Sequence, residues 1–387
     1  MSSSPYTSAT GPGTATYPNN LVEGEGLFES VPNFSEGRRE DVIAAIAGAG
    51  GAHVLDVDAD PDHHRAVISL AAERRRLVDG LLGAVGTAVE RIDVRAHSGV
   101  HPRVGAADVV PIVPLGASTL ASAREVAREV GERIWTELRV PVYWYGEHQS
   151  LADIRAGRGK LDLGGPGLHP TAGAVSVGAR LTLVAFNVLL PGMSLTDAAD
   201  VARSLRESRL GMRGVQALVF ELSGGRVQLS MNLFRVDETA PAAVVAELAR
   251  RGVAVGEQQV VGLCPAIAAG EAAGGRLLEG RLASAAARAA GLRLTERGDE
   301  ESLALALRLV READALAALT ADQLELLVGA ERAAALAPVL RVAGVLDREL
   351  AAMLDAAARG LRAAITEETA GAYSTRIAAL DRRLDGR

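Results

Sequence analysis

Short apolar segments rich in β-branched residues alternate with Ala/Leu/Val segments of helical period, from about residue 27 to residue 265. The order is β-α-β-β-α-β, and it occurs twice. The first set covers 27–31, 38–50, 52–58, 65–71, 74–92 and 108–115, with an added helix at 118–138 and strand at 140–145. The second set covers 180–190, 194–208, 215–222, 226–234, 240–251 and 257–265. We therefore expect an α/β (α+β) protein with two ferredoxin-like subdomains side by side and a ligand groove between their sheets.

Composition divides the chain into four expected parts. Residues 1–26 are rich in Ser, Thr, Pro and Gly and lack the basic start and apolar stretch of a secretory signal, so we expect a disordered tail. Residues 27–179 and 180–266 are the expected N-terminal and C-terminal subdomains. From 267 to 387 the chain is rich in Ala, Leu, Arg and Glu without a strand signal, which predicts an all-helical region of four or five helices. No role is predicted for this region.

Charge and cysteine content exclude several function classes. The formal net charge is −7 and long basic runs are missing, which argues against a nucleic-acid-binding surface. The single cysteine, Cys264, excludes an internal disulfide and a thiolate metal cluster and fits a reducing compartment, so the cytoplasm is the expected location. No apolar run approaches the roughly 20 residues of a membrane helix, so no membrane partner is expected.

The segment HSGVHPRVG, residues 97–105, contains two histidines four positions apart. A metal site of that spacing requires a continuous helix, which Gly99 and Pro102 interrupt, so no metal is expected. Two interpretations of His101 remain. It is either an ordinary surface histidine in a turn, or a functional side chain whose backbone is restricted by the proline that follows. Histidine can give and take a proton near neutral pH.

Two other polar loops lie between expected elements. In DVDADPDHHR, residues 56–65, we expect Asp60 and Asp62 to form a polar β-turn. Asp58 closes a strand, where its carboxylate can orient an imidazole, and Arg65 opens the next strand, where it can meet an anionic substrate. The loop VPNFSEGRR, residues 31–39, either caps a helix or presents side chains and backbone N–H groups to a ligand. Both interpretations stay open.

Several segments taken together resemble the formiminotransferase (glutamate formimidoyltransferase) family. They are VPNFSEG, LDVDADPDHHR, IDVRAHSGVHPRVGAADVVPIVPL, LADIRAG, LHPTAGAVSVGAR, LVAFN and LSMNL, and they follow the family's order and spacing over about residues 27–266. The resemblance implies transfer of a formimino group from N-formimino-L-glutamate to N5 of tetrahydrofolate, in histidine degradation and one-carbon metabolism. Tetrahydrofolate is then the co-substrate, bound between two α/β subdomains. The resemblance also implies a homo-oligomer, most commonly a dimer.

Carried over by position, the family's catalytic histidine falls on His101 and its assisting acidic residue on Asp58. Positions of the family's folate-contacting segment are Lys160, Asp162, Leu163, Gly164 and Gly165. Other positions in family motifs that are expected to line the groove are Asn33, Glu36, Arg65, Arg103, His169, Thr171, Asn187 and Asn232. N5 must lose a proton as it attacks, and glutamate must gain one as it leaves as an amine. One imidazole can do both, and Arg65 and Arg103 can meet glutamyl carboxylates.

The sequence departs from the family pattern at a few positions. Val100 stands where family members usually carry Glu, and His64 stands where they carry Asn. The loop 146–160 is short, and the chain beyond 266 lacks the opening of a cyclodeaminase domain, so cyclisation is not expected. These departures motivate an alternative function, a non-catalytic or altered-substrate folate-binding homologue with the helical tail as an interaction module. A metal-dependent hydrolase is a third interpretation. The donor, the folate polyglutamate length and the oligomer size are not predicted.

Overall fold

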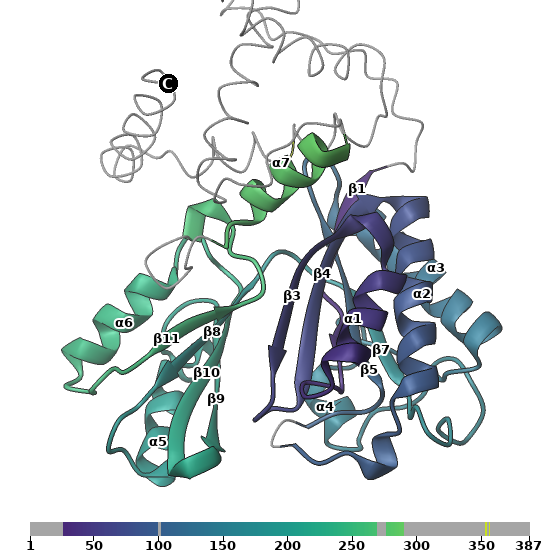
Figure 1. The fold of residues 1–387 in the computed structure, drawn as a ribbon. Coiled ribbons are helices and arrows are strands. Elements are labelled where there is room, and N and C mark those ends of the chain that lie inside the picture. The colour runs from purple at the N-terminus through teal and green to yellow at the C-terminus, as the bar shows by residue number, and fades with distance from the viewer. Residues whose placement is uncertain (1–25, 100–101, 269–275, 290–352, 354–355, 357–387) are drawn as a thin grey trace, which may run out of the picture.

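A computed structural model describes residues 26–99, 102–268 and 276–289, together with Met353 and Ala356 (Figure 1). Most of the expected tail and most of the expected helical region 267–387 therefore lie outside the described residues. So does His101, the histidine to which the family resemblance assigns catalysis.

The first sheet contains seven strands from the N-terminal half of the chain. They are β1 (Leu27–Ser30), β2 (Asn33–Phe34), β3 (Val54–Asp60), β4 (Arg65–Glu73), β5 (Ala107–Pro114), β6 (Val142–Trp144) and β7 (Val175–Ala179). Both β1 and β2 pair with β4 on one side and β5 on the other, so they form one interrupted strand. The spatial order is β3, β4, β1/β2, β5, β7, β6. Pairing is antiparallel from β3 to β5 and parallel from β5 to β6.

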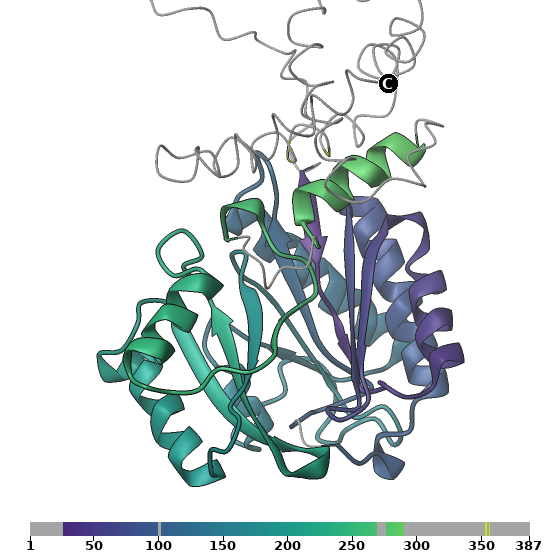
Figure 2. The same ribbon diagram turned by 60° about the vertical axis from the view of Figure 1, so that its left-hand side comes forward.

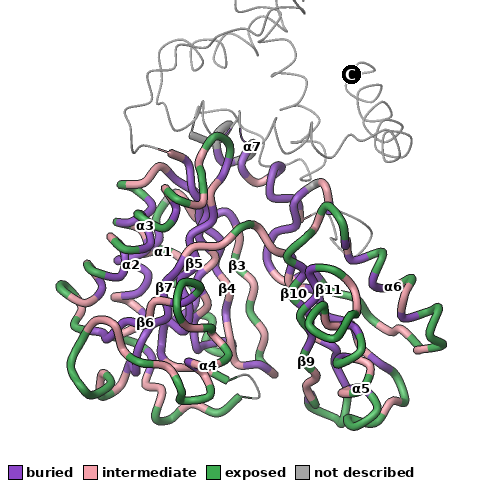
Figure 3. Tube along the Cα trace, turned by 180° about the vertical axis from the view of Figure 1, so that it is seen from behind, coloured by how far each residue is buried: buried purple, intermediate pink, exposed green. Residues whose placement is uncertain are grey.

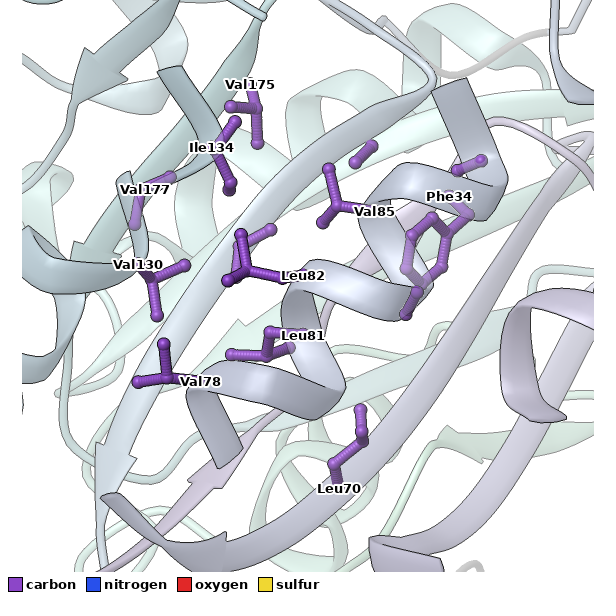
Figure 4. Packing of buried hydrophobic residues seen from close by; sticks show 14 of the residues in the cluster. Phe34, Leu70, Val78, Leu81, Leu82, Val85, Val130, Ile134, Val175 and Val177 are labelled. Atoms are coloured by element: carbon purple, nitrogen blue, oxygen red, sulfur yellow. The ribbon is translucent and has the colours of Figure 1, made fainter. Parts of the chain in front are cut away.

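Three helices cover one face of this sheet: α1 (Glu40–Ala49), α2 (Arg74–Arg91) and α3 (Leu120–Arg133), which continues into one π-helical turn, Ile134–Leu138 (Figure 1). In α2 the buried residues recur at helical spacing, so one apolar face meets the sheet. Figure 4 shows Leu81 and Val85 of α2 packed with Phe34 and Leu70 of the sheet. Because these side chains are fully buried, this packing holds the strand ends that carry polar residues in a fixed place.

The second sheet has four strands and two helices from the C-terminal half. The strands are β8 (Val184–Leu189), β9 (Val215–Leu222), β10 (Arg226–Leu233) and β11 (Gln258–Val261), and the helices are α5 (Leu195–Leu205) and α6 (Pro241–Arg250). The strand order is β11, β8, β10, β9, and every pairing is antiparallel. Phe186, Leu229 and Met231 belong to the apolar core of this half, so the alternate residues of the same strands point to the opposite face.

The two halves lie side by side (Figures 1 and 2). Contacts join them at the β3–β4 hairpin, at the β9–β10 hairpin and along the chain that follows β11. At the tip of the β3–β4 hairpin, the ring of His63 meets Phe220 of β9 edge-on at 5.3 Å. Nearby, Arg226 Nη2 donates to Asp62 Oδ2 at 3.0 Å. Figure 3 shows that buried residues concentrate inside each half, whereas the outer helices carry exposed residues.

A helix after the second sheet, α7 (Leu278–Ala289), lies against the end of the first sheet. Its Leu278 and Leu282 form an apolar cluster with Leu27, Leu55 and other buried residues. The chain that leads into α7 carries Arg276, whose guanidinium bonds to the carboxylates of Asp56 and Asp58 on β3. No described helix combines the length and the apolar character that crossing a membrane requires.

The structure is a mixed α/β protein, as expected, and most expected elements occur within a few residues of their predicted bounds. Three elements were not expected: β2, β7 and the short helix α4 (Leu151–Arg155). β7 has only five residues, VSVGA, at the end of a Gly-rich segment, so its strand signal is short. The strand expected at 180–190 begins only at Val184 because the preceding residues connect the two sheets.

Candidate active site

The histidine-rich loop after α2 packs closely on the β3–β4 hairpin. The loop leaves a short 3-10 turn, Val94–Ala96, and is described through Gly99 and again from Pro102. A Cβ atom built on Gly99 would lie 2.7 Å from the His63 carbonyl oxygen and 2.8 Å from Arg103 Nη2. Only glycine leaves room for this approach, so Gly99 lies directly against the hairpin.

The hairpin turn is formed by Asp60, as the sequence predicted. Its Oδ1 accepts hydrogen bonds from the backbone N–H groups of Asp62 and His63 at 2.8 and 2.9 Å, and its Oδ2 lies 2.7 Å from His63 Nδ1. Burial acts to raise the pKa of Asp60, but the bonds from His63 outweigh it and the pKa is lowered. Asp60 is therefore a structural turn residue, and Asp62 uses its carboxylate to hold Arg226 of the other half.

His64 has a backbone φ of 49°, in the left-handed region where asparagine, aspartate and histidine are enriched among non-glycine residues. This conformation is one that a histidine adopts more readily than most side chains do, which suits His64 to the turn. The Gly37 N–H donates to His64 Nδ1 at 3.1 Å, so a neutral ring carries its proton on Nε2. Glu36 Oε1, at 3.4 Å from the same nitrogen, is then a neighbour rather than a hydrogen-bond acceptor.

The rings of His64 and His97 stack with centroids 4.0 Å apart, and His97 Nε2 lies 3.0 Å from the His64 carbonyl oxygen. Arg103 Nη1 contacts the His97 ring. Burial lowers the pKa of His97 to about 4, and the positive charge of Arg103 acts in the same direction. Burial also lowers the pKa of His64. Both imidazoles beside the loop are thus held neutral near pH 7.

Glu36 accepts hydrogen bonds from the residues that lead into α1. Its Oε1 accepts from the backbone N–H groups of Arg38 and Arg39 at 2.9 and 3.0 Å, and its Oε2 accepts from Arg39 Nε at 2.6 Å. Burial opposes ionisation, but these hydrogen bonds outweigh it and lower the pKa of Glu36. The capping interpretation of this loop therefore accounts for Glu36. Asn33 instead accepts from Arg65 Nε at 2.8 Å and so positions that guanidinium.

Arginines gather around the buried carboxylate of Asp108, at the start of β5. Asp108 Oδ2 accepts from Arg65 Nη2 at 3.4 Å and from Arg155 Nη2 at 2.5 Å, and Oδ1 accepts from the Val104 N–H at 2.8 Å. Burial lowers the pKa of Arg65 to about 10; Asp108 opposes this shift, and Arg155 and Arg103 add to it. A small cavity of about 10 Å³ lies here, with room for about one water-sized atom. Its lining residues are Ser35, His63, His64, Arg65, Arg103 and Asp108.

Asp58, the expected assistant of His101, is bonded to the chain that follows the second sheet. Its Oδ2 accepts from the Gly262 N–H at 3.1 Å and from Arg276 Nη1 at 2.8 Å. This arrangement fixes the carboxylate in position between the two halves. Its role toward His101 stays a prediction.

The expected folate-contacting segment is anchored to β6, the edge strand of the first sheet. Asp162 Oδ2 accepts from the Trp144 N–H at 2.7 Å and from Gln149 Nε2 at 2.8 Å, and Leu163 pairs through its backbone with Val142. Lys160 bonds through its backbone to the Gln149 side chain. Gly164 adopts a φ of 112°, and a side chain there would clash with Pro141. Gly165, which follows it, is exposed.

His169 and Thr171 lie in a turn beside the histidine loop. His169 Nδ1 accepts from the Ala172 N–H at 3.0 Å, and the Thr171 carbonyl accepts from the Val94 N–H at 2.8 Å. In the second sheet, Asn187 of β8 pairs with Ser230 of β10. Asn232 is two residues after Ser230 on the same strand, so the two share a face. Both asparagines therefore point to the sheet face away from α5 and α6; Asn187 is buried and Asn232 exposed.

The structure thus brings together Asn33, Glu36, Arg65 and Arg103 near the histidine loop. It also adds four residues that were not expected at the site: His64, His97, Asp108 and Arg155. Asp108 lies in an apolar run that reads as a strand, and Arg155 is 47 residues away along the chain. Among the described residues, no group of three or more His, Cys, Asp or Glu side chains is arranged to hold a metal ion.

Comparison with known proteins identifies the family. The model of the formiminotransferase domain, N-terminal subdomain, matches residues 27–180. A glutamate formimidoyltransferase from Thermoplasma acidophilum is 37% identical over 268 residues, which cover 62% of this chain and 88% of that protein. The chain belongs to the glutamate formimidoyltransferase family. The resemblance seen in the motifs is thereby confirmed.

Two further relatives of this chain differ in length. A glutamate formimidoyltransferase from Streptococcus pyogenes is 35% identical over 271 residues, or 62% of this chain and 89% of that protein. The formimidoyltransferase-cyclodeaminase of Rattus norvegicus is 36% identical over 273 residues. That match covers 62% of this chain and only 50% of the rat protein. The chain therefore spans about half the length of this bifunctional relative.

Proposed function

We propose that this protein transfers the formimino group of N-formimino-L-glutamate to N5 of tetrahydrofolate. The observation that carries the proposal is the 37% identity across 88% of a glutamate formimidoyltransferase. The polar cluster described above supports it, because arginines and neutral imidazoles surround the loop that leads to His101. Both substrates carry carboxylates, which guanidinium groups bind with charge-assisted hydrogen bonds.

The proposed chemistry is acid–base catalysis by His101. N5 attacks the formimino carbon and loses its proton to the imidazole as the new C–N bond forms. The bond from that carbon to the glutamate nitrogen then breaks, and the imidazolium returns a proton to this nitrogen, so glutamate leaves as an amine. Such proton transfer typically contributes about 10²–10⁴-fold to rate. His97, whose pKa is lowered to about 4, does not compete for the proton near neutral pH.

Asp58 completes this proposal as the residue that orients or stabilises the charged imidazole. Its support is positional, since hydrogen bonds from Gly262 and Arg276 fix its carboxylate. A carboxylate in this role stabilises the imidazolium without itself being protonated.

We further propose that each half is a ferredoxin-like unit and that folate lies in a groove between the two sheets. The support is the β-α-β-β-α-β order of each half, with antiparallel strand order β5, β1, β4, β3 in one and β11, β8, β10, β9 in the other. Asn187 and Asn232 would then face folate, as would the segment from Lys160 to Gly165. A cytoplasmic homo-oligomer that needs no metal, with a dimer favoured, belongs to the same proposal.

The test is a formimino-transfer assay that compares the wild type with His101→Ala, with tetrahydrofolate binding measured separately. The proposal expects turnover in the wild type and a loss of at least about 10²-fold in the variant, with folate binding retained. Equal turnover in both proteins would remove His101 from the mechanism.

Val100 and His64 favour one alternative, a homologue that binds folate without this transfer. Folate binding with no turnover in the wild type would support that alternative. His101→Gln provides a second variant, because glutamine keeps hydrogen-bonding groups but cannot take up and release a proton near neutral pH.

A further inference from the structure

Positive charge exceeds negative charge in the arginine cluster. Arg65, Arg103 and Arg155 act on one another electrostatically, and Asp108 is the carboxylate that acts on both Arg65 and Arg103. Asp108 is buried and bonds directly to two of the three guanidinium groups. Three guanidinium groups in a partly buried place act on one another here, and this concentration of positive charge favours binding of an anion.

Arg155 also has a hydrogen-bond donor that no described residue satisfies. Its Nε–H is buried and has no partner in the part of the chain that the structure describes. Leaving a charged donor without an acceptor costs more than leaving a neutral one, so native proteins usually supply a partner, an ordered water or a ligand. The side chain is held in place because Ile154, its neighbour on α4, packs against Val109 and Tyr145.

We propose that Arg155, together with Arg65 and Arg103, binds the α-carboxylate of the amino-acid donor. Asp108 is the positioning residue that orients the guanidinium groups between turnovers. The inference rests on the proposed function and assigns one end of one substrate to this cluster. The guanidinium fork suits carboxylate because it can donate two parallel N–H bonds to the two oxygens.

The position of the cluster distinguishes the donor from the folate tail. In the donor, the α-carboxylate is attached to the carbon that bears the formimino nitrogen. In folate, the glutamyl carboxylates are separated from N5 by the p-aminobenzoyl group. The cluster shares Arg103 with the histidine loop, and Gly99 of that loop lies against the same guanidinium. An anion bound here lies beside the histidine loop, and the donor's α-carboxylate suits that place better than the folate carboxylates because it is next to the carbon that bears the formimino nitrogen.

The experiment compares Arg155→Gln with Arg158→Gln in the full chain. Arg158 follows the same helix, is 65% exposed and pairs with Asp153, so it is a matched surface control. We expect Arg155→Gln to raise the KM for formiminoglutamate about ten- to a hundredfold, which is the typical effect of losing a charge-assisted hydrogen bond. The KM for tetrahydrofolate and the KM values of Arg158→Gln should stay close to those of the wild type. Arg155→Lys should be intermediate, because it retains charge without the planar fork.

A binding measurement separates this inference from the proposed function. The affinities of the protein for three amino acids are compared. L-glutamate is the amino acid released in the proposed reaction, L-isoglutamine has an amide in place of its α-carboxylate, and L-glutamine has an amide in place of its side-chain carboxylate. The wild type should discriminate most strongly against L-isoglutamine, and Arg155→Gln should lose that discrimination. Transfer activity with an unchanged donor KM in Arg155→Gln would overturn the subsite and leave the function intact. Arg155-dependent glutamate binding without any transfer would overturn the function and leave the subsite intact.

Discussion

Arg276 is the residue whose removal should most weaken the connection between the first sheet and the chain that follows the second. Its guanidinium bonds to Asp58 at 2.8 Å and also to Asp56. The side chains of Asp56 and Asp58 are 8% and 11% exposed, and that of Arg276 is 27% exposed. Both carboxylates are on the same face of β3, two residues apart. Without Arg276, Asp56 would keep Arg281 at 3.8 Å, but Asp58 would lose its guanidinium partner beside the like charge of Asp56.

We predict that Arg276→Met destabilises the protein by about 2–4 kcal/mol. Two hydrogen bonds to charged groups are worth about 1.5–3 kcal/mol each. The sum is discounted because the arginine is partly exposed, which brings it below the roughly 3–5 kcal/mol typical of breaking a fully buried pair. Methionine keeps most of the apolar stem, so lost packing contributes little.

The matched control is Arg226→Met. Arg226 also bonds across the two halves, to Asp62 at 3.0 Å, but these side chains are 50% and 25% exposed. We expect this exposed pair to be worth about 0–1 kcal/mol. Urea unfolding of the full-length variants, followed by circular dichroism and tryptophan fluorescence, gives the comparison. Equal destabilisation by the two substitutions would refute the reasoning that burial determines the cost. Hydrogen exchange should locate the extra loss for Arg276→Met in β3 and the start of α7.

Two further predictions concern Glu29 and Gly99. Burial raises the pKa of Glu29 to about 7, with Arg180 opposing the shift, so wild-type stability should fall as the pH rises from about 4.5 through 7. Glu29→Gln lacks this dependence on pH. Between pH 5 and 8 the stability of the wild type, measured by urea unfolding, should fall relative to that of the variant by on the order of 2–3 kcal/mol. The assignment would be contradicted if the stabilities of the two proteins changed equally with pH. Gly99→Ala places a methyl group against the His63 carbonyl and should reduce transfer about 10²-fold with the overall fold retained. Gly48→Ala, on open space in α1, is its control and should leave transfer unchanged.

The elements with a strict pattern were predicted closely. β9 occupies 215–222 as expected, because a segment rich in β-branched and aromatic residues lies between Gly214 and the turn residues that begin at Ser223. α2 occupies Arg74–Arg91, within one residue of the expected 74–92, because its apolar residues recur at helical spacing. α4 was missed because five residues carry too little periodicity. Its position is determined by tertiary packing, because Ile154 contacts Val109 and Tyr145 of the first half.

Some residues of the arginine cluster were expected in the groove and others were not, because tertiary packing brings the unexpected ones to the site. Asn33 and Arg65 were each expected to line the groove from family position, and the structure joins them by a hydrogen bond. The pair Asp108–Arg155 has no local signal, since an aspartate within an apolar strand and an arginine ending a short helix are both ordinary. Only the pairing of β5 with its neighbours and the packing of α4 bring them together. The assignment of His101 comes from the family resemblance, and the residue lies outside the described residues.

The most direct test of the central proposal follows the transferred carbon itself. N-formimino-L-glutamate labelled with ¹³C at the formimino carbon is incubated with tetrahydrofolate and the protein, and the label is followed by NMR. The proposal predicts that the label moves from the glutamate nitrogen to N5 of tetrahydrofolate, with one glutamate released for each group transferred. A label that stays on the donor, or that appears in a free one-carbon product without tetrahydrofolate, would contradict it.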